Sequence, residues 1–177
     1  MSAMREVRVQ PTGRERLWGE EEIIVSKTDL KGIITYANLT FLKVSGYSEA
    51  ELLGKPHNIL RHPDMPRCVF KLLWDTIEAG REIFAYVKNM AKNGDHYWVF
   101  AHVTPTFDAR GKIIGYHSNR RCPHRHQVQI FDDLYRQLLA EEKRHTDWRE
   151  GMAAAGQIIQ NAVAQKNMTY DEFIFSV

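Results

Sequence analysis

The sequence predicts an α+β protein in which a strand pair, short helices and one longer helix precede three further strands and a helical C-terminal extension. Three observations support this prediction. Residues 22–37 and 82–120 are rich in β-branched and aromatic residues between turn residues, which is typical of strands. Residues 66–79 instead place apolar side chains at helical spacing. The length of 177 residues suits one domain with extensions.

The N-terminal residues 1–21 form a polar lead-in that contains Pro11 and Gly13. We expect loose order in this segment, with a short helix near residues 15–18. Trp18 is expected to pack back onto the domain, because a large apolar ring is seldom left in water.

The first strands are expected at residues 22–29 and 33–37, where β-branched residues dominate. Gly32, in the turn between them, can take the positive φ that tight turns require. The short separation predicts an antiparallel hairpin.

Two short helices are expected next. Asn38 is a good N-cap for the first, and Gly46 can end it. Ser48 and Glu51 have the spacing of a capping box at the start of the second, and Gly54 ends that helix.

The stretch at residues 55–66 holds two histidines, an arginine, an aspartate and three prolines. Each proline biases the residue before it away from helix, so we expect a turn or short helix and then a stiff polar kink. Pro66 suits the first turn of the longer helix, and Gly80 lies just past its end. A stiff loop rich in charge and imidazole is suited to presenting hydrogen-bond donors.

The late strands are expected at residues 82–90, 96–106 and 112–120. Asn93-Gly94 between the first two is a strong signal for a tight hairpin. Residues 108–111 form a second hairpin turn.

Two amphipathic helices are expected in the C-terminal extension, at residues 127–149 and about 152–166. Gly151 and Gly156 suggest a bend between them. The apolar stripe of the first helix is typical of a docking surface or a dimer coil. Residues 169–177 end on an apolar patch that needs a partner surface.

The composition excludes several classes of protein. A net charge of +2 does not favour nucleic acid or a membrane surface. No apolar run approaches the roughly 20 residues that span a bilayer, and the N-terminus lacks the apolar core of a signal peptide. Cys68 and Cys122 show no disulfide framework and no metal spacing, so the cytoplasm is the expected compartment.

The residues alone leave alternatives open at three places. Arg61, His62 and Asp64 could be a surface ion-pair loop, which composition by itself favours. Asn89 could be a strand-end turn residue as readily as a ligand contact. Trp74 is read first as core packing against a sheet.

The order of the elements resembles that of a PAS domain over about residues 22–121. The resemblance rests on the motifs Thr28–Asn38, Gly46-Tyr-Ser, Glu51-Leu-Leu-Gly54, Lys92–Trp98 and Gly111–Tyr116. Within this family, residues 56–66 followed by Val87-Lys-Asn89 are similar to the FAD-binding sensor domain of aerotaxis receptors.

This resemblance implies a PAS fold: a five-stranded antiparallel sheet with helices on one face, enclosing a flavin and followed by C-terminal amphipathic helices. It divides the chain into a lead-in at 1–21, a sensor domain at 22–122 and a C-terminal helical extension at 123–177 that serves signal output or dimerisation.

The resemblance also implies a set of cofactor-binding residues. The positions that match those important for FAD in aerotaxis receptors are Asn38, Arg61, His62 and Asp64. Asn89 matches an asparagine that bonds the polar edge of the flavin ring in flavin-binding PAS domains. Val99 aligns with a second flavin-bonding asparagine of light-sensing LOV domains. His57 stands where LOV domains have their reactive cysteine, and His117 where they have a glutamine near flavin N5. The complete set is Asn38, His57, Asn58, Arg61, His62, Asp64, Trp74, Asn89, Val99 and His117.

The function implied is a cytoplasmic redox or oxygen sensor that holds FAD non-covalently and relays the flavin's redox state to a separate signalling protein, such as a chemoreceptor or kinase component. A homodimer is expected, since the exit stripe needs burial. The alternatives are a haem sensor with His57 or His62 on the iron, and a cofactor-free interaction module. An enzyme is not expected, because the sequence lacks a nucleophile triad, a phosphate loop and a nicotinamide fingerprint. Neither a metal site nor a nucleic-acid partner is expected.

Overall fold

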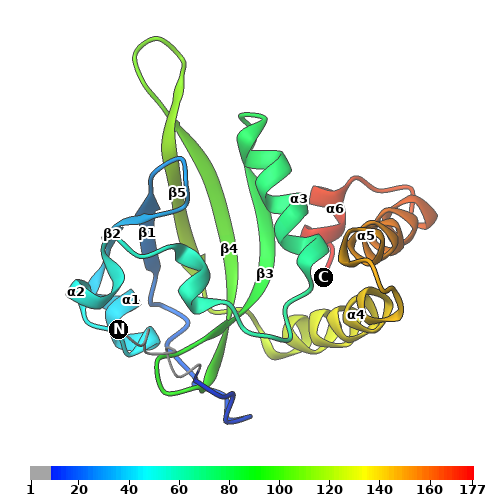
Figure 1. Ribbon diagram of the computed structural model, residues 1–177, viewed down its shortest axis with the longest axis horizontal. Coiled ribbons are helices and arrows are strands. Elements are labelled where there is room, and N and C mark those ends of the chain that lie inside the picture. The colour runs from blue at the N-terminus through cyan, green and yellow to red at the C-terminus, as the bar shows by residue number, and fades with distance from the viewer. Residues whose placement is uncertain (1–8) are drawn as a thin grey trace, which may run out of the picture.

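Five strands form one antiparallel sheet in the computed structural model, which describes residues 9–177. The strands are β1 (Ile24–Thr28), β2 (Ile34–Ala37), β3 (Ile83–Met90), β4 (His96–Phe107) and β5 (Ile113–Arg121). Their order across the sheet is β2-β1-β5-β4-β3, so β2 and β3 are the edge strands (Figure 1). The predicted α+β architecture with a five-stranded antiparallel sheet is confirmed.

The two faces of the sheet differ because successive side chains of a strand point to opposite sides. The inner face carries Val87 and Asn89 from β3, and Val99 from β4, and these side chains line a cavity. The outer face carries Tyr86 and Trp98, which pack against C-terminal aromatic rings.

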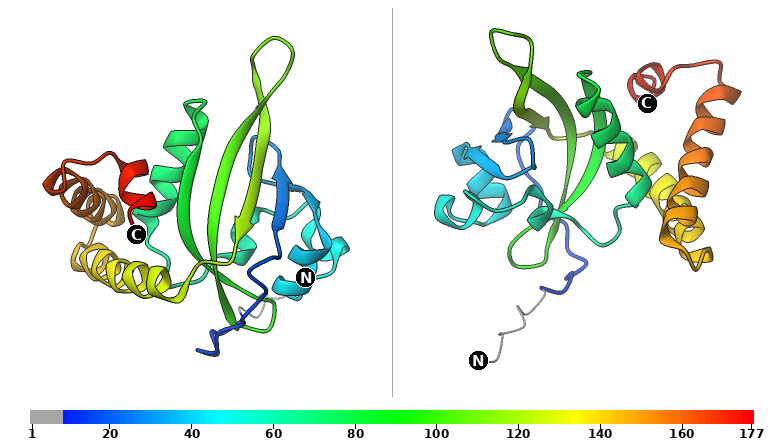
Figure 2. Two further views of the ribbon diagram at one scale, coloured as in Figure 1. Left: turned by 180° about the vertical axis from the view of Figure 1, so that it is seen from behind. Right: turned by 45° about the horizontal axis from the view of Figure 1, so that its top comes forward.

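The inner face is covered by α1 (Leu39–Ser45), α2 (Glu49–Leu52), the short 3-10 helix η1 (His57–Leu60) and α3 (Arg67–Glu78). Figure 1 shows η1 and α3 in front of the sheet, and the reverse view in Figure 2 shows the sheet in front of them. The predicted caps are present: Asn38 accepts a hydrogen bond from the backbone N–H of Phe41, and Ser48 with Glu51 forms the capping box. Pro66 is the N-cap of α3, one residue earlier than expected.

The C-terminal extension folds back beside the edge strand β3 as α4 (Arg125–Arg144), α5 (Trp148–Gln165) and α6 (Tyr170–Phe175) (Figure 2). Phe131 of α4 stacks on Tyr86 with ring centroids 4.1 Å apart, and the Tyr135 hydroxyl donates to the Tyr86 carbonyl at 2.5 Å. Phe175 of α6 contacts Phe84 at a centroid distance of 4.6 Å.

The apolar stripe of α4 and the apolar tail are therefore buried on the chain's own sheet. The tail needs no separate protein to cover Phe173 and Ile174, which are both buried. The exit stripe consequently gives no reason to expect a homodimer, and the homodimer stays a prediction without that support.

The break between α4 and α5 is not where the glycines indicated. The first helix ends at Arg144, and α5 begins after Asp147, whose side chain accepts a hydrogen bond from the backbone N–H of Arg149. Gly151 lies inside α5. A Cβ at this position would stand 2.5 Å from the Glu142 carbonyl oxygen, which explains why the residue is a glycine. The glycine thus permits close helix packing and does not make a bend.

The expected short helix at residues 15–18 is wrong. This segment is extended and pairs with the start of β4: the N–H of Arg16 donates to the His96 carbonyl at 2.7 Å, and the N–H of His96 donates to the Arg14 carbonyl at 2.9 Å. Trp18 does pack back, since its indole N–H donates to the Trp98 carbonyl at 3.1 Å. Residues 1–8 of the predicted lead-in lie outside the described residues.

No helix within residues 9–177 is both long and apolar enough to cross a bilayer.

Replacement of Gly151 by alanine should lower the free energy of unfolding. The new methyl group would overlap the Glu142 carbonyl, and overpacking of this kind typically costs about 1–3 kcal/mol. Urea denaturation followed by circular dichroism measures the effect.

Gly156→Ala is the matched control, because the nearest atom to its Cβ is Cys68 Cβ at 4.0 Å. We expect this variant to be stabilised by up to about 1 kcal/mol, since alanine favours helix more than glycine does. Equal destabilisation of both variants would show that close packing at Gly151 is not the reason for its presence.

Candidate functional site

A cavity of about 720 Å³ lies between the inner face of the sheet and the helices η1 and α3. This volume is within the range of small-molecule and cofactor sites, roughly 300–1,000 Å³. Its walls are largely apolar, with side chains from β3, β4 and α3. The apolar lining consists of Val87, Val99, Ala101, Val103, Phe70, Leu73, Trp74 and Ile77.

One group of polar side chains, the Arg120 cluster, interrupts the apolar lining. We define it as Arg120 and Ser118 on β5, Ser26 on β1 and His57 on η1, all of which line the cavity. The Arg120 side chain is 2% exposed, its Nε donates to Ser118 Oγ at 3.1 Å, and one of its Nη atoms donates to Ser26 Oγ. The guanidinium carbon lies 4.8 Å from the centre of the Phe41 ring.

The Arg120 guanidinium is not neutralised by an acid. No carboxylate among residues 9–177 lies within ion-pair distance of it, and its Nη1 has no hydrogen-bond partner. A buried charge normally requires a partner, because desolvation is costly. A ligand with a carbonyl or anionic oxygen would supply the missing acceptor.

His57 is electrically neutral in this environment. Burial, together with the nearby positive charge of Arg120, lowers its pKa to about 3. Burial also lowers the pKa of Arg120 to about 10, so the guanidinium stays charged at neutral pH. His57 Nε2 lies 3.4 Å from Ser26 Oγ. A neutral imidazole has one donor and one acceptor nitrogen to offer.

The polar kink of the sequence passes along the edge strand β3. The backbone of Arg61 pairs with that of Asn89, and both residues line the cavity. Asn89 is 5% exposed, so its amide is held inside the domain. The guanidinium carbon of Arg61 lies 4.6 Å from the centre of the Phe70 ring.

Comparison with known proteins identifies the domain. The family described as PAS fold matches residues 34–120. The aerotaxis receptor of Escherichia coli (strain K12) is 45% identical over 121 residues, which are 68% of this chain and 24% of the receptor. This part of the chain is a PAS domain.

Other relatives agree with that assignment. The nitrogen fixation regulatory protein of Klebsiella pneumoniae is 29% identical over 102 residues, or 58% of this chain and 21% of that protein. The dark structure of the blue-light photoreceptor Aureochrome1 LOV is similar with a TM-score of 0.55 at 25% identity, covering 60% of this chain and 80% of that one. The chain spans about a quarter or less of the length of the aerotaxis and nitrogen fixation proteins.

The PAS domain brings together most of the residues that the sequence singled out. Trp74 lines the cavity and also packs edge-to-face on Tyr116, with centroids 5.5 Å apart, so its packing and site interpretations are compatible. The predicted residues that line the cavity are His57, Asn58, Arg61, Trp74, Asn89 and Val99.

The structure corrects the placement of His117 and Asn38, neither of which lines the cavity. His117 stands between Tyr116 and Ser118, which do line it, so the two-residue period of β5 turns the His117 side chain to the outer face. The Asn38 amide is occupied elsewhere: its oxygen accepts from the N–H groups of Val25 and Phe41, and its nitrogen donates to a backbone carbonyl.

His62 and Asp64 also lie away from the cavity lining. His62 is 2% exposed, and its Nδ1 accepts a hydrogen bond from the Asp64 N–H at 3.1 Å. The Asp64 carboxylate forms an ion pair with Lys88 at 3.1 Å. Asp64 thus takes part in the surface ion pairing that composition favoured.

Sequence reasoning missed Arg120, Ser26 and Ser118. The only signal was periodic, since residues 116, 118 and 120 must share one face of β5. A charged residue at a strand end is usually exposed, so there was no reason from the sequence to expect Arg120 in the cavity.

Replacement of His62 by glutamine should flatten the dependence of stability on pH. Burial, with a smaller effect from Lys88, lowers the His62 pKa from 6.5 to about 4. The unfolded chain therefore binds more protons, and stability that is complete above pH 6.5 declines as the pH falls towards 4. Urea denaturation at several pH values should show a slope that is lower in the variant by up to about 1.4 kcal/mol per pH unit. An unchanged slope would mean that His62 is protonated as readily in the folded chain as in the unfolded one.

Proposed function

We propose that this PAS domain binds FAD non-covalently and works in the cytoplasm as a redox or oxygen sensor, relaying the state of the flavin to a partner signalling protein. The observation that carries the proposal is the buried Arg120 guanidinium, which lines an apolar cavity and has no carboxylate partner among residues 9–177. The resemblance to the sensor domain of aerotaxis receptors supports the same cofactor class.

The lining suits the shape and polarity of an isoalloxazine ring. Such a ring has broad apolar faces and one edge of carbonyl and N–H groups. Val99 and Trp74 offer apolar surface, while the Asn89 amide can both donate and accept. Arg120 can donate to a carbonyl oxygen with a charge-assisted hydrogen bond.

A bound flavin would supply electron exchange, and the protein would supply tuning and readout. The Arg120 charge is buried beside a neutral His57, so it favours added negative charge at this end of the cavity more strongly than an exposed arginine would. The apolar walls limit the access of water to that end.

The readout in this proposal does not run through His117, because its side chain is on the outer face of the sheet. We infer that β3 carries the readout. Asn89 faces the cavity, and Tyr86, three residues away on the same strand, faces α4 and accepts a hydrogen bond from Tyr135 at 2.5 Å. A shift of β3 at Asn89 would therefore be transmitted to α4.

A thiol-based photocycle is not part of the proposal. Among the described residues, no cysteine lines the cavity. The resemblance to LOV domains places His57 where those domains have their reactive cysteine. The N–H of Cys68 donates to the Glu142 carboxylate, and burial raises the pKa of its thiol to about 12.

The partner belongs to the proposal as well. A chemoreceptor or kinase component is the expected partner, and a homodimer of this chain stays a prediction that the buried exit stripe does not support. The output of the full-length aerotaxis receptor is not carried over, because this chain covers 24% of that protein.

The binding test uses FAD titrated into ligand-free protein and followed by flavin fluorescence. Arg120→Met should weaken FAD binding roughly 10- to 100-fold, which corresponds to losing a hydrogen bond from a charged donor. Asn89→Ala should weaken it by about 10-fold. Melting curves show whether each variant is folded. If Arg120→Met does not fold, Arg120→Lys is used in its place, because it keeps the positive charge.

His117→Ala is the matched control, because sequence alone placed this residue at the flavin and the structure places it outside the cavity. Its affinity should equal that of the unmodified chain. Full affinity in both Arg120→Met and Asn89→Ala, or loss only in His117→Ala, would contradict the site. A haem spectrum would favour the haem sensor with His57 on the iron. Folded protein that takes up neither cofactor would favour the interaction module.

A further inference from the structure

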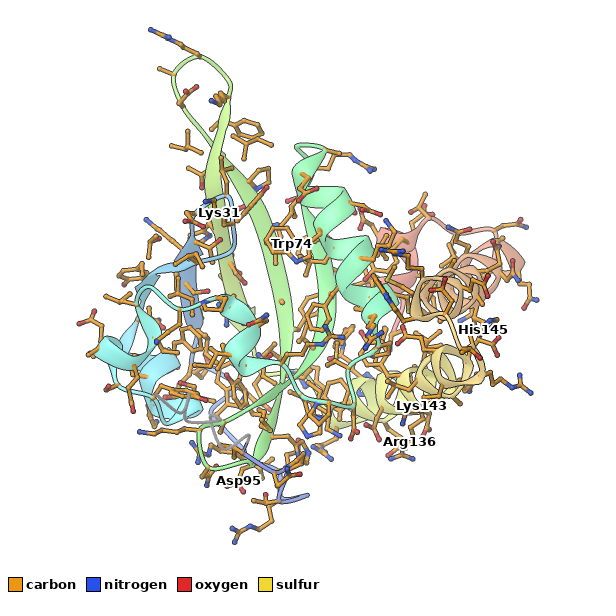
Figure 3. All side chains as sticks on the ribbon, in the orientation of Figure 1. Lys31, Trp74, Asp95, Arg136, Lys143 and His145 are labelled. Carbon is orange, nitrogen blue, oxygen red and sulfur yellow. The ribbon has the colours of Figure 1, made fainter. Side chains whose placement is uncertain are left out.

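The cavity extends from the sheet to the C-terminal extension. Trp148 and Met152 of α5 line it, although both lie beyond the matched family region, residues 34–120. Arg67 of α3 and Lys31 of the β1–β2 turn line it too. Figure 3 labels Lys31 at the β1–β2 turn and Trp74 on α3. With Trp148 and Met152, the lining therefore draws on the turn, α3 and α5.

Trp148 presents an aromatic surface at this rim. Its side chain is 50% exposed, which is unusual for a tryptophan that has an apolar core within reach. The guanidinium carbon of Arg67 lies 5.6 Å from the centre of the ring, and that of Arg149 lies 5.1 Å from it. A half-exposed indole beside two guanidinium groups is a suitable platform for stacking a nucleobase that carries phosphates.

The charge of the lining has one sign. The described lining residues include no aspartate or glutamate. Their cations are Lys31, Arg61, Arg67, Lys71 and Arg120. Lys71 pairs with Asp75 at 2.6 Å, but Arg67 has no carboxylate within ion-pair distance among residues 9–177. A cationic rim beside an aromatic platform suits a ligand that carries phosphates and a base.

We propose that Trp148 and Arg67 form a subsite for the adenosine diphosphate end of FAD, so that α5 is part of the ligand site. This inference rests on the proposed function, which places the flavin ring at the Arg120 cluster. FMN has the ring and one phosphate but no adenosine. The subsite would therefore distinguish FAD from FMN.

The subsite also gives the ligand a direct contact with the extension. Trp148 begins α5, and Gly151 in the next turn lies against the Glu142 carbonyl of α4. A ligand that stacks on Trp148 would therefore stabilise α5 on both α3 and α4. The extension would respond to occupancy by FAD and not by FMN.

The test compares the dissociation constants of FAD and FMN for the full chain and for Trp148→Ala, by isothermal titration calorimetry. The unmodified chain should prefer FAD. Trp148→Ala should weaken the binding of FAD roughly 5- to 100-fold, which corresponds to the loss of one base–aromatic stack. Its affinity for FMN should change by less than about twofold. Trp148→Phe should keep most of the preference, because it retains an aromatic face.

Phe107→Ala is the matched control. Phe107 is 48% exposed at the end of β4 and does not line the cavity, so both affinities should be unchanged. If Trp148→Ala weakens the binding of FAD and FMN equally, or weakens neither, the subsite is overturned while the flavin proposal stands. Failure of the unmodified chain to bind either flavin would overturn both.

Discussion

The structure depends on how one buried positive charge is accommodated. Arg120 projects from β5 into the domain, where it donates to Ser26 of β1 and Ser118 of its own strand and lies over Phe41 of α1. Burying a guanidinium costs free energy for every donor that is left unsatisfied, and here one nitrogen, Nη1, has no acceptor. Burial lowers the pKa of His57, and the Arg120 charge lowers it further, so this end of the cavity holds one positive charge beside a neutral imidazole.

The fold could be predicted from local sequence signals because those signals act over a few residues. Asn38 caps α1 and Gly46 ends it in a left-handed conformation, while Gly94 takes the positive φ that the β3–β4 turn needs. Predictions failed where distant contacts decide the outcome. Residues 15–18 form no helix because their backbone pairs with β4, and Gly151 makes no bend because α4 packs against it. Neither contact is visible in a local window.

The site was predicted less completely, for related reasons. A family resemblance assigns a position but not the face of a strand, and an error of one residue moves a side chain from the cavity to the outer face, as happened with His117. Asn38 is polar and near the site in sequence, yet the backbone uses all of its amide. Trp148 could not be predicted at all, since only the folding of the extension beside β3 brings it to the cavity.

The central claim is that the cavity around Arg120 holds a flavin. The most direct measurement is the visible absorption spectrum of the purified chain, followed by release of the chromophore and chromatographic separation of FAD from FMN. We expect the two broad bands of oxidised flavin and release of FAD. A sharp haem band, or colourless folded protein from cultures supplied with riboflavin and a haem precursor, would contradict the account.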